Sequence, residues 1–142
     1  MKFVERQEFR GDPARVWERL SNLETIPTYW HGTRELKVAQ SGGRVVGDIV
    51  FAFGGRGKAE ITVDDRRRTL AYNYLEGPFK GTQTVVVKDN VIQAEWDVTF
   101  KGAYRVLGPL NASHFRSGTR HALMRLCEGQ TAESEAPSAT TS

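Results

Sequence analysis

Hydrophobic and polar side chains alternate with a period of two from Arg34 to Lys101. Alternation of this kind predicts β-strands that bury one face and expose the other. Turn-forming residues interrupt the pattern at regular intervals, as expected for antiparallel neighbours. The expected strands cover residues 34–40, 44–53, 58–64, 69–76, 82–88 and 91–101. The sequence therefore predicts an antiparallel meander as the main part of the fold.

One face of this sheet is expected to be hydrophobic and concave. The residues expected on it are Val45, Ile49, Phe51, Phe53, Ala59, Ile61, Val63, Leu70, Tyr72, Tyr74, Val85, Val87, Ile92, Ala94, Trp96, Val98 and Phe100. The polar Gln83 falls on the same side, whereas charged residues such as Asp48, Glu95 and Asp97 fall on the other. The sheet is therefore predicted to have one solvated face and one face that other elements cover.

Residues 2–10 also alternate and predict a first strand, which brings the expected sheet to seven strands. Asp12 followed by Pro13 is typical of a helix start, because the carboxylate accepts a hydrogen bond from a free backbone N–H and proline has its φ already set. A helix is expected over residues 13–22. Pro27 permits only a second short helix or turn before the meander.

A long last helix is expected to begin near Asn111 or Ser113 and to end at Gly129. Its hydrophobic stripe is Phe115, Thr119, Ala122, Leu123 and Leu126. The segment 130–142 has no large hydrophobic residue and predicts a disordered tail, because burial cannot offset the entropy lost on ordering it. The domain is therefore expected over residues 1–129.

The composition fits one domain that folds without metal or disulfide support, with 142 residues, 39% of them hydrophobic. The single cysteine, Cys127, cannot form an internal disulfide and falls in a helical hydrophobic pattern, so a buried thiol in a reducing compartment is expected. The N-terminus lacks a signal peptide and no segment is apolar enough for a membrane span. We therefore expect a cytoplasmic protein.

The net charge of +3 is too small, and its basic residues too dispersed, to indicate nucleic-acid binding. A weak contact with a membrane surface or a protein partner remains open. Arg116 and Arg120 are expected on the outer face of the last helix, where an accessory subunit could bind a partner. The sequence does not determine the oligomeric state.

Three segments resemble a known superfamily. They are Phe9-x-x-Asp12-Pro13-x-x-Val16-Trp17-x-x-Leu20-Ser21, Arg66-Arg-Arg-Thr-Leu-Ala-Tyr72, and Trp96-Asp-Val-Thr-Phe-Lys-Gly102 with the following Leu107-Gly-Pro-Leu110. Together with the element order, they resemble the Bet v 1-like, START-related superfamily of polyketide cyclases, aromatases and lipid-transfer domains. Within it, the third segment looks like the carbon monoxide dehydrogenase G subgroup. The resemblance implies an α+β helix-grip fold, in which a curved seven-stranded sheet wraps around the long C-terminal helix.

The resemblance also implies an internal cavity for a hydrophobic small molecule such as a lipid, a quinone or a polycyclic, polyketide-like compound. The expected ligand-binding residues are Tyr29, Trp30, Phe51, Phe53, Tyr72, Tyr74, Trp96, Phe100, Phe115 and Leu123. A carrier, sensor or accessory protein is the first hypothesis, because no catalytic constellation stands out. Ordinary core packing of these aromatic residues is the alternative interpretation.

A polyketide cyclase or aromatase that works by acid–base chemistry is the second hypothesis. His31, Tyr72, Tyr74 and Glu5 are its candidate catalytic residues. No metal site is expected, because His114 and His121 are seven residues apart, about 10.5 Å along a helix axis. No cofactor is expected either. The pattern does not identify the ligand.

Overall fold

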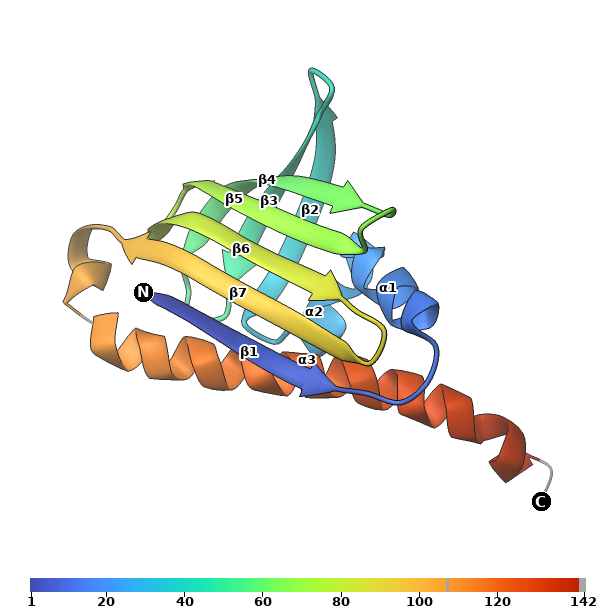
Figure 1. Cartoon of the computed structure of the whole chain (residues 1–142). Helices are drawn as coiled ribbons and strands as arrows, with labels where there is room; N and C mark the ends of the chain where they lie inside the picture. The colour runs from blue at the N-terminus through green and yellow to red at the C-terminus, as the bar shows by residue number, and fades with distance from the viewer. Residues whose placement is uncertain (107, 141–142) are drawn as a thin grey trace.

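The computed structural model describes residues 1–106 and 108–140. The elements follow the order strand, short helices, six strands and a long helix (Figure 1). Their bounds are β1 (Lys2–Glu8), α1 (Pro13–Ser21), η1 (Leu23–Thr25), α2 (Ile26–Tyr29), β2 (Thr33–Ser41), β3 (Arg44–Phe51), β4 (Arg56–Asp64), β5 (Thr69–Glu76), β6 (Phe79–Val87), β7 (Val91–Phe100), η2 (Gly102–Arg105) and α3 (Gly108–Thr140). The elements η1 and η2 are single 3₁₀ turns.

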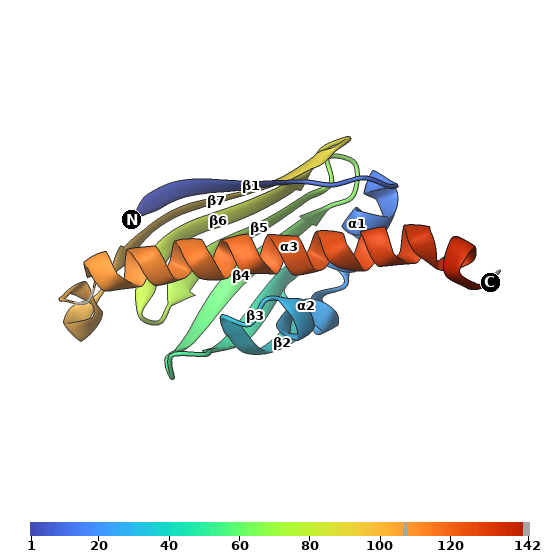
Figure 2. The same ribbon diagram turned by 90° about the horizontal axis from the view of Figure 1, so that it is seen from below.

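The seven strands form one antiparallel sheet in the order β1-β7-β6-β5-β4-β3-β2. The sheet curves, and α3 crosses its concave side, as the view from below shows most clearly (Figure 2). The short helices α1 and α2 lie at one end of this arrangement (Figures 1 and 2). The predicted α+β helix-grip fold is therefore confirmed.

The first helix begins where the sequence predicted. The side chain of Asp12 accepts a hydrogen bond from the backbone N–H of Ala14 at 2.9 Å, and Pro13 occupies the first helical turn. The buried face of α1 includes Trp17, whose indole N–H donates to the Asp65 carboxylate at 2.9 Å. This bond fixes α1 against the turn between β4 and β5.

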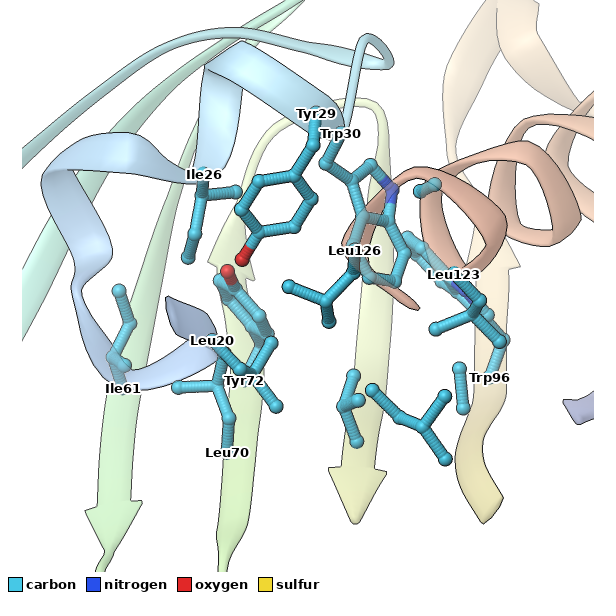
Figure 3. Close-up of a cluster of buried hydrophobic side chains, with 14 of the residues drawn as sticks. Leu20, Ile26, Tyr29, Trp30, Ile61, Leu70, Tyr72, Trp96, Leu123 and Leu126 are labelled. Atoms are coloured by element: carbon cyan, nitrogen blue, oxygen red, sulfur yellow. The ribbon is translucent and has the colours of Figure 1, made fainter. Parts of the chain in front are cut away.

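The core lies between the concave face of the sheet, α3 and the short helices (Figure 3). Leu20 of α1, Ile26 of α2 and Leu126 of α3 are fully buried here against sheet residues such as Leu70. Burying a side chain of this size stabilises the fold by about 1.5–3 kcal/mol. The same contacts hold the helices at one end of the sheet.

Two residues of the expected hydrophobic face are exposed. Phe53 has an exposed fraction of 41% and Val63 of 37%. For Phe53 the reason is that β3 ends at Phe51, so the alternation does not continue to this position. Val63 lies one residue from the end of β4, whereas Ala59 and Ile61 further inside the same strand are buried.

The turn predicted over 77–81 is shorter than expected, because β6 already begins at Phe79. Gly81 is paired with Val98 inside the sheet and has a positive φ of 132°. A Cβ atom on Gly81 would collide with the carbonyl oxygen of Asp97. The glycine therefore permits a close approach of two backbones, and it does not form a turn.

The last helix differs from the prediction at both ends. It begins at Gly108, and neither Asn111 nor Ser113 starts it. It continues to Thr140 and does not end at Gly129, since extending an existing helix avoids the cost of nucleating one. The backbone of residues 130–140 is part of this helix. The expected disorder of the segment 130–142 stays a prediction. The sufficiency of residues 1–129 as a folding unit stays a prediction.

The two arginines expected on the outer face of α3 are exposed there and also contact the first strand. Arg116 Nε and Arg120 Nη2 each lie 3.4 Å from Glu5 Oε1, and the guanidinium of Arg116 also lies over the ring of Phe3. Glu5 is half-buried on the same strand face as Phe3 and is paired by these contacts. The two arginines therefore join α3 to β1, while their side chains stay more than half exposed. A protein partner on this face stays a prediction.

Candidate ligand-binding cavity

A cavity of about 300 Å³ lies between the sheet, α3 and the segment that connects α2 to β2. Its hydrophobic wall consists of Trp30, Phe51, Phe53, Tyr74, Trp96 and Phe115. Its more polar lining is His31, Thr33, Gln83, His114, Ser117, Thr119, His121 and Arg125. Gly32, Ala52 and Gly118 complete the lining. A cavity that combines aromatic walls with polar groups is a common form of a site for a small organic molecule.

Aromatic rings form a continuous surface on the sheet side of the cavity. Tyr74 and Trp96 stack with ring centroids 5.8 Å apart and an angle of 6° between their planes. Phe115 of α3 meets Trp96 edge to face at 5.2 Å, and Phe51 stacks on Phe53 at 5.4 Å. These rings offer flat, rigid surface for stacking against a planar ligand.

Two hydrogen-bonded pairs lie in this surface. The Tyr74 hydroxyl donates to Gln83 Oε1 at 2.7 Å, and Trp96 Nε1 donates to Thr119 Oγ1 at 3.0 Å. Gln83 is 3% exposed and Thr119 is 1% exposed. No hydrogen bond joins Gln83 Nε2 to any described residue, so this buried amide has a donor left for a ligand oxygen.

One stripe of α3 lines the mouth of the cavity. His114, Gly118, His121 and Arg125 follow one another at intervals of four, three and four residues, which places them on one face of the helix. His31 lies across from them, after α2. We call His31, His114, His121 and Arg125 the cavity rim.

Hydrogen bonds between the helices fix this end of the cavity. Arg125 Nη1 donates to the carbonyl oxygen of Tyr29 at 3.2 Å, directly before Trp30. Arg19 of α1 donates in turn to the carbonyl oxygens of Arg125 and Leu126. The position of Trp30 at the mouth therefore depends on α1 and α3 together.

Six of the ten residues expected to bind a ligand line the cavity: Trp30, Phe51, Phe53, Tyr74, Trp96 and Phe115. The other four, Tyr29, Tyr72, Phe100 and Leu123, are buried in the surrounding core. In Figure 3 the hydroxyl groups of Tyr29 and Tyr72 point toward one another between α2 and β5. Both side chains are therefore part of the core and not of the cavity lining.

The candidate catalytic residues do not form one group. His31 and Tyr74 line the cavity, whereas Tyr72 and Glu5 do not. The His31 ring contacts the carbonyl oxygen of Thr28 at 3.3 Å. Burial raises the pKa of the Tyr72 and Tyr74 hydroxyls well above the usual value, and each is raised further by a neighbouring tyrosine. At neutral pH these two groups are hydrogen-bond donors and weak acids.

The residue pattern alone does not reveal the rim residues of α3. It indicates His114 and His121 only as a possible metal pair, and it does not indicate Arg125. Their common stripe lies directly beside the hydrophobic stripe of the same helix, and this adjacency is the signal in the sequence.

Within the described residues, no group of three or more His, Cys, Asp or Glu side chains is placed to hold a metal ion. None of the helices in the described ranges 1–106 and 108–140 has the length and hydropathy of a membrane span.

The fold is similar to that of several solved structures. A protein from Thermus thermophilus is 19% identical with a TM-score of 0.79, covering 94% of this chain and 99% of that one. The Zhui aromatase/cyclase from a Streptomyces species is 16% identical with a TM-score of 0.66, covering 90% and 93%. A START superfamily protein from Mycobacterium smegmatis is 12% identical with a TM-score of 0.62, covering 88% and 98%. At these identities the likeness shows the fold.

Comparison with sequences gives a more definite result. No curated protein sequence matches the chain. One family model, described as polyketide cyclase/dehydrase and lipid transport, matches residues 1–133, which include every strand and the described lining of the cavity. The narrower likeness to the carbon monoxide dehydrogenase G subgroup stays a prediction. On this match and this fold, the chain belongs to the polyketide cyclase/dehydrase and lipid transport family.

Proposed function

We propose that the protein binds a hydrophobic small molecule in the cavity and acts as a carrier or sensor without transforming it. The observation that carries this proposal is the aromatic cavity of about 300 Å³, with the free amide donor of Gln83 inside it. Stacking on Tyr74 and Trp96 would supply the affinity, and the amide would orient a ligand oxygen. Lipids, quinones and polycyclic compounds remain the candidate classes.

The hydrogen bonds of the lining support binding over catalysis. Among its described residues, none of these bonds joins two titratable side chains. General acid–base catalysis needs a donor or acceptor with a matched pKa and a partner that orients it. The Tyr74 hydroxyl has a raised pKa and is bonded to a neutral amide, so it is a poor general base.

Native mass spectrometry of the gently purified protein tests this proposal. We expect a one-to-one complex, either with a molecule retained from the expression host or with an added hydrophobic probe such as phenylnaphthylamine. The control is the same protein unfolded in acid, which should release the ligand. A homogeneous ligand-free mass with every probe would contradict the proposal.

A cyclase or aromatase is the second candidate, and one observation favours it. The Tyr74 hydroxyl is a protonated acid held at the cavity wall by Gln83, in the place where a ligand oxygen would lie. Such an enzyme should lose turnover of a polyketide-like substrate in Tyr74→Phe while its affinity for that substrate changes little. Equal loss of affinity and turnover would indicate a binding role alone.

A further inference from the structure

The cavity rim gathers all three histidines of the chain at one place. His31 comes from the segment after α2, and His114 and His121 lie about two turns apart on α3. Arg125 extends the same helical stripe by one turn. The hydrophobic core does not require histidines at these positions, because His31, His114 and His121 are exposed.

The described lining of the cavity contains basic residues and no acidic ones. The Arg125 guanidinium is permanently positive, and a histidine ring can donate a hydrogen bond from either nitrogen when protonated. None of the described residues that line the cavity is Asp or Glu. A concave surface with cationic and donor groups and without carboxylates attracts anions.

Gly118 leaves space in the middle of this stripe. A Cβ atom at Gly118 would meet no atom within 4 Å, and the glycine lies between His114 and His121 on the same helix face. A group that enters the cavity here has histidine rings on both sides and Arg125 one turn further along. Aromatic residues, among them Tyr74 and Trp96, line the same cavity.

We propose that the ligand is an amphipathic organic anion, whose planar hydrophobic body lies against Tyr74 and Trp96 and whose acidic oxyanion group lies at the cavity rim. The inference rests on the proposed function and specifies the ligand class. Arg125 provides the main ionic contact, and the rim histidines donate hydrogen bonds to the same group. A neutral molecule of the same shape leaves these donors without a partner.

The test compares two fluorescent probes that differ in one group. Anilinonaphthalenesulfonate carries a sulfonate, and phenylnaphthylamine is the same ring system without it. Dissociation constants for both probes are measured by fluorescence titration of the full-length protein. Raising the ionic strength should weaken binding of the sulfonate and leave the neutral probe almost unchanged.

Arg125→Gln is the main variant. We expect it to weaken sulfonate binding about tenfold, as for the loss of one charge-assisted hydrogen bond, while phenylnaphthylamine stays within about twofold. Arg116→Gln is the matched control, because Arg116 lies on the same helix but faces Glu5, and it should change neither affinity. Arg125→Gln also removes the hydrogen bond to the carbonyl oxygen of Tyr29, so it changes the structure as well as the charge. His121→Gln is therefore a second variant, because the His121 side chain is exposed.

The results separate this inference from the function on which it rests. Selective loss of sulfonate affinity in Arg125→Gln or His121→Gln supports the inference. An affinity ratio of the two probes that is the same in wild type and in both variants overturns it and leaves hydrophobic binding intact. If neither probe binds the folded wild-type protein, the proposed function itself is contradicted.

Discussion

The indole N–H of Trp96 donates a hydrogen bond to the hydroxyl of Thr119 at 3.0 Å. Trp96 lies on β7 and Thr119 on α3, so the bond joins the sheet to the helix beside the cavity. Both residues are buried, at 5% and 1% exposed. The bond therefore sets the distance between the two walls that would enclose a ligand.

Thr119→Val should destabilise the protein by about 1–3 kcal/mol, because it keeps the shape of the side chain but leaves the Trp96 N–H buried without an acceptor. The free energy of unfolding in urea measures the loss. The same substitution in a Trp96→Phe background should cost much less, since the donor is already absent. Equal losses in the two backgrounds would show that the bond contributes no stability.

Tyr29→Phe should raise the free energy of unfolding by about 1 kcal/mol. The Tyr29 side chain is 1% exposed, and its hydroxyl has no hydrogen-bond partner among the described residues. Removing a buried unpaired polar group stabilises a protein, whereas Tyr74→Phe removes a bond to Gln83 and should destabilise it. Urea unfolding of both variants provides the comparison. A destabilised Tyr29→Phe would mean that the hydroxyl has a partner in solution.

Gly118→Ala should stabilise the protein by about 0.5–1 kcal/mol, because glycine is costly inside a helix and the added Cβ meets no atom within 4 Å. The matched substitution Gly81→Ala should be strongly destabilising, since its Cβ would collide with the Asp97 carbonyl. Thermal unfolding of the two variants is sufficient to compare them. A destabilised Gly118→Ala would indicate that the helix packs more tightly at this point than the structure shows.

Stability should fall as the pH rises above about 9. Burial raises the pKa of the Cys127 thiol from 9.0 to about 11, so the unfolded chain loses this proton at a lower pH than the folded protein does. The stabilisation is complete below pH 9 and is lost between about 9 and 11, with a maximum of about 3 kcal/mol. Burial also raises the pKa of Tyr29, Tyr72 and Tyr74, which extends the loss to higher pH.

Urea unfolding between pH 7.5 and 10.5 measures this dependence. Cys127→Ala is the control, because it removes the thiol and should flatten the curve near pH 9 to 10. Identical pH dependence in wild type and Cys127→Ala would contradict the assigned thiol pKa. The native thiol should also react slowly with iodoacetamide, since the protonated form is a weak nucleophile.

The local and periodic features of the fold could be predicted from sequence. The Asp12 cap depends on neighbouring residues, and the strands from β2 to β7 depend on an alternation that every residue repeats. The exposed Val63 could not be predicted this way, because alternation assigns a residue to a face of the sheet but does not show how much of that face is covered. The same holds for Arg116, whose partner Glu5 lies at the other end of the chain.

The candidate site was predictable only in part for the same physical reason. Aromatic residues of the inward face, such as Trp96, follow from strand alternation. The position of the rim residue Arg125 does not follow from a local pattern. The α3 stripe that carries Arg125 lines a cavity only because of how α3 and the segment after α2 are placed in the fold. Tyr72 faces inward as predicted but lies under α2, so it belongs to the core.

The central claim is that a hydrophobic molecule occupies the cavity beside α3. The most direct test is fluorescence titration of phenylnaphthylamine with wild type, Gly118→Leu and Ser113→Leu. Gly118→Leu places a side chain in the cavity mouth, whereas Ser113→Leu places the same side chain on the same helix outside the lining. We predict saturable one-to-one binding to wild type and Ser113→Leu, and a loss of about tenfold or more in Gly118→Leu. Unchanged affinity in a folded Gly118→Leu, or no binding to wild type, would contradict the claim.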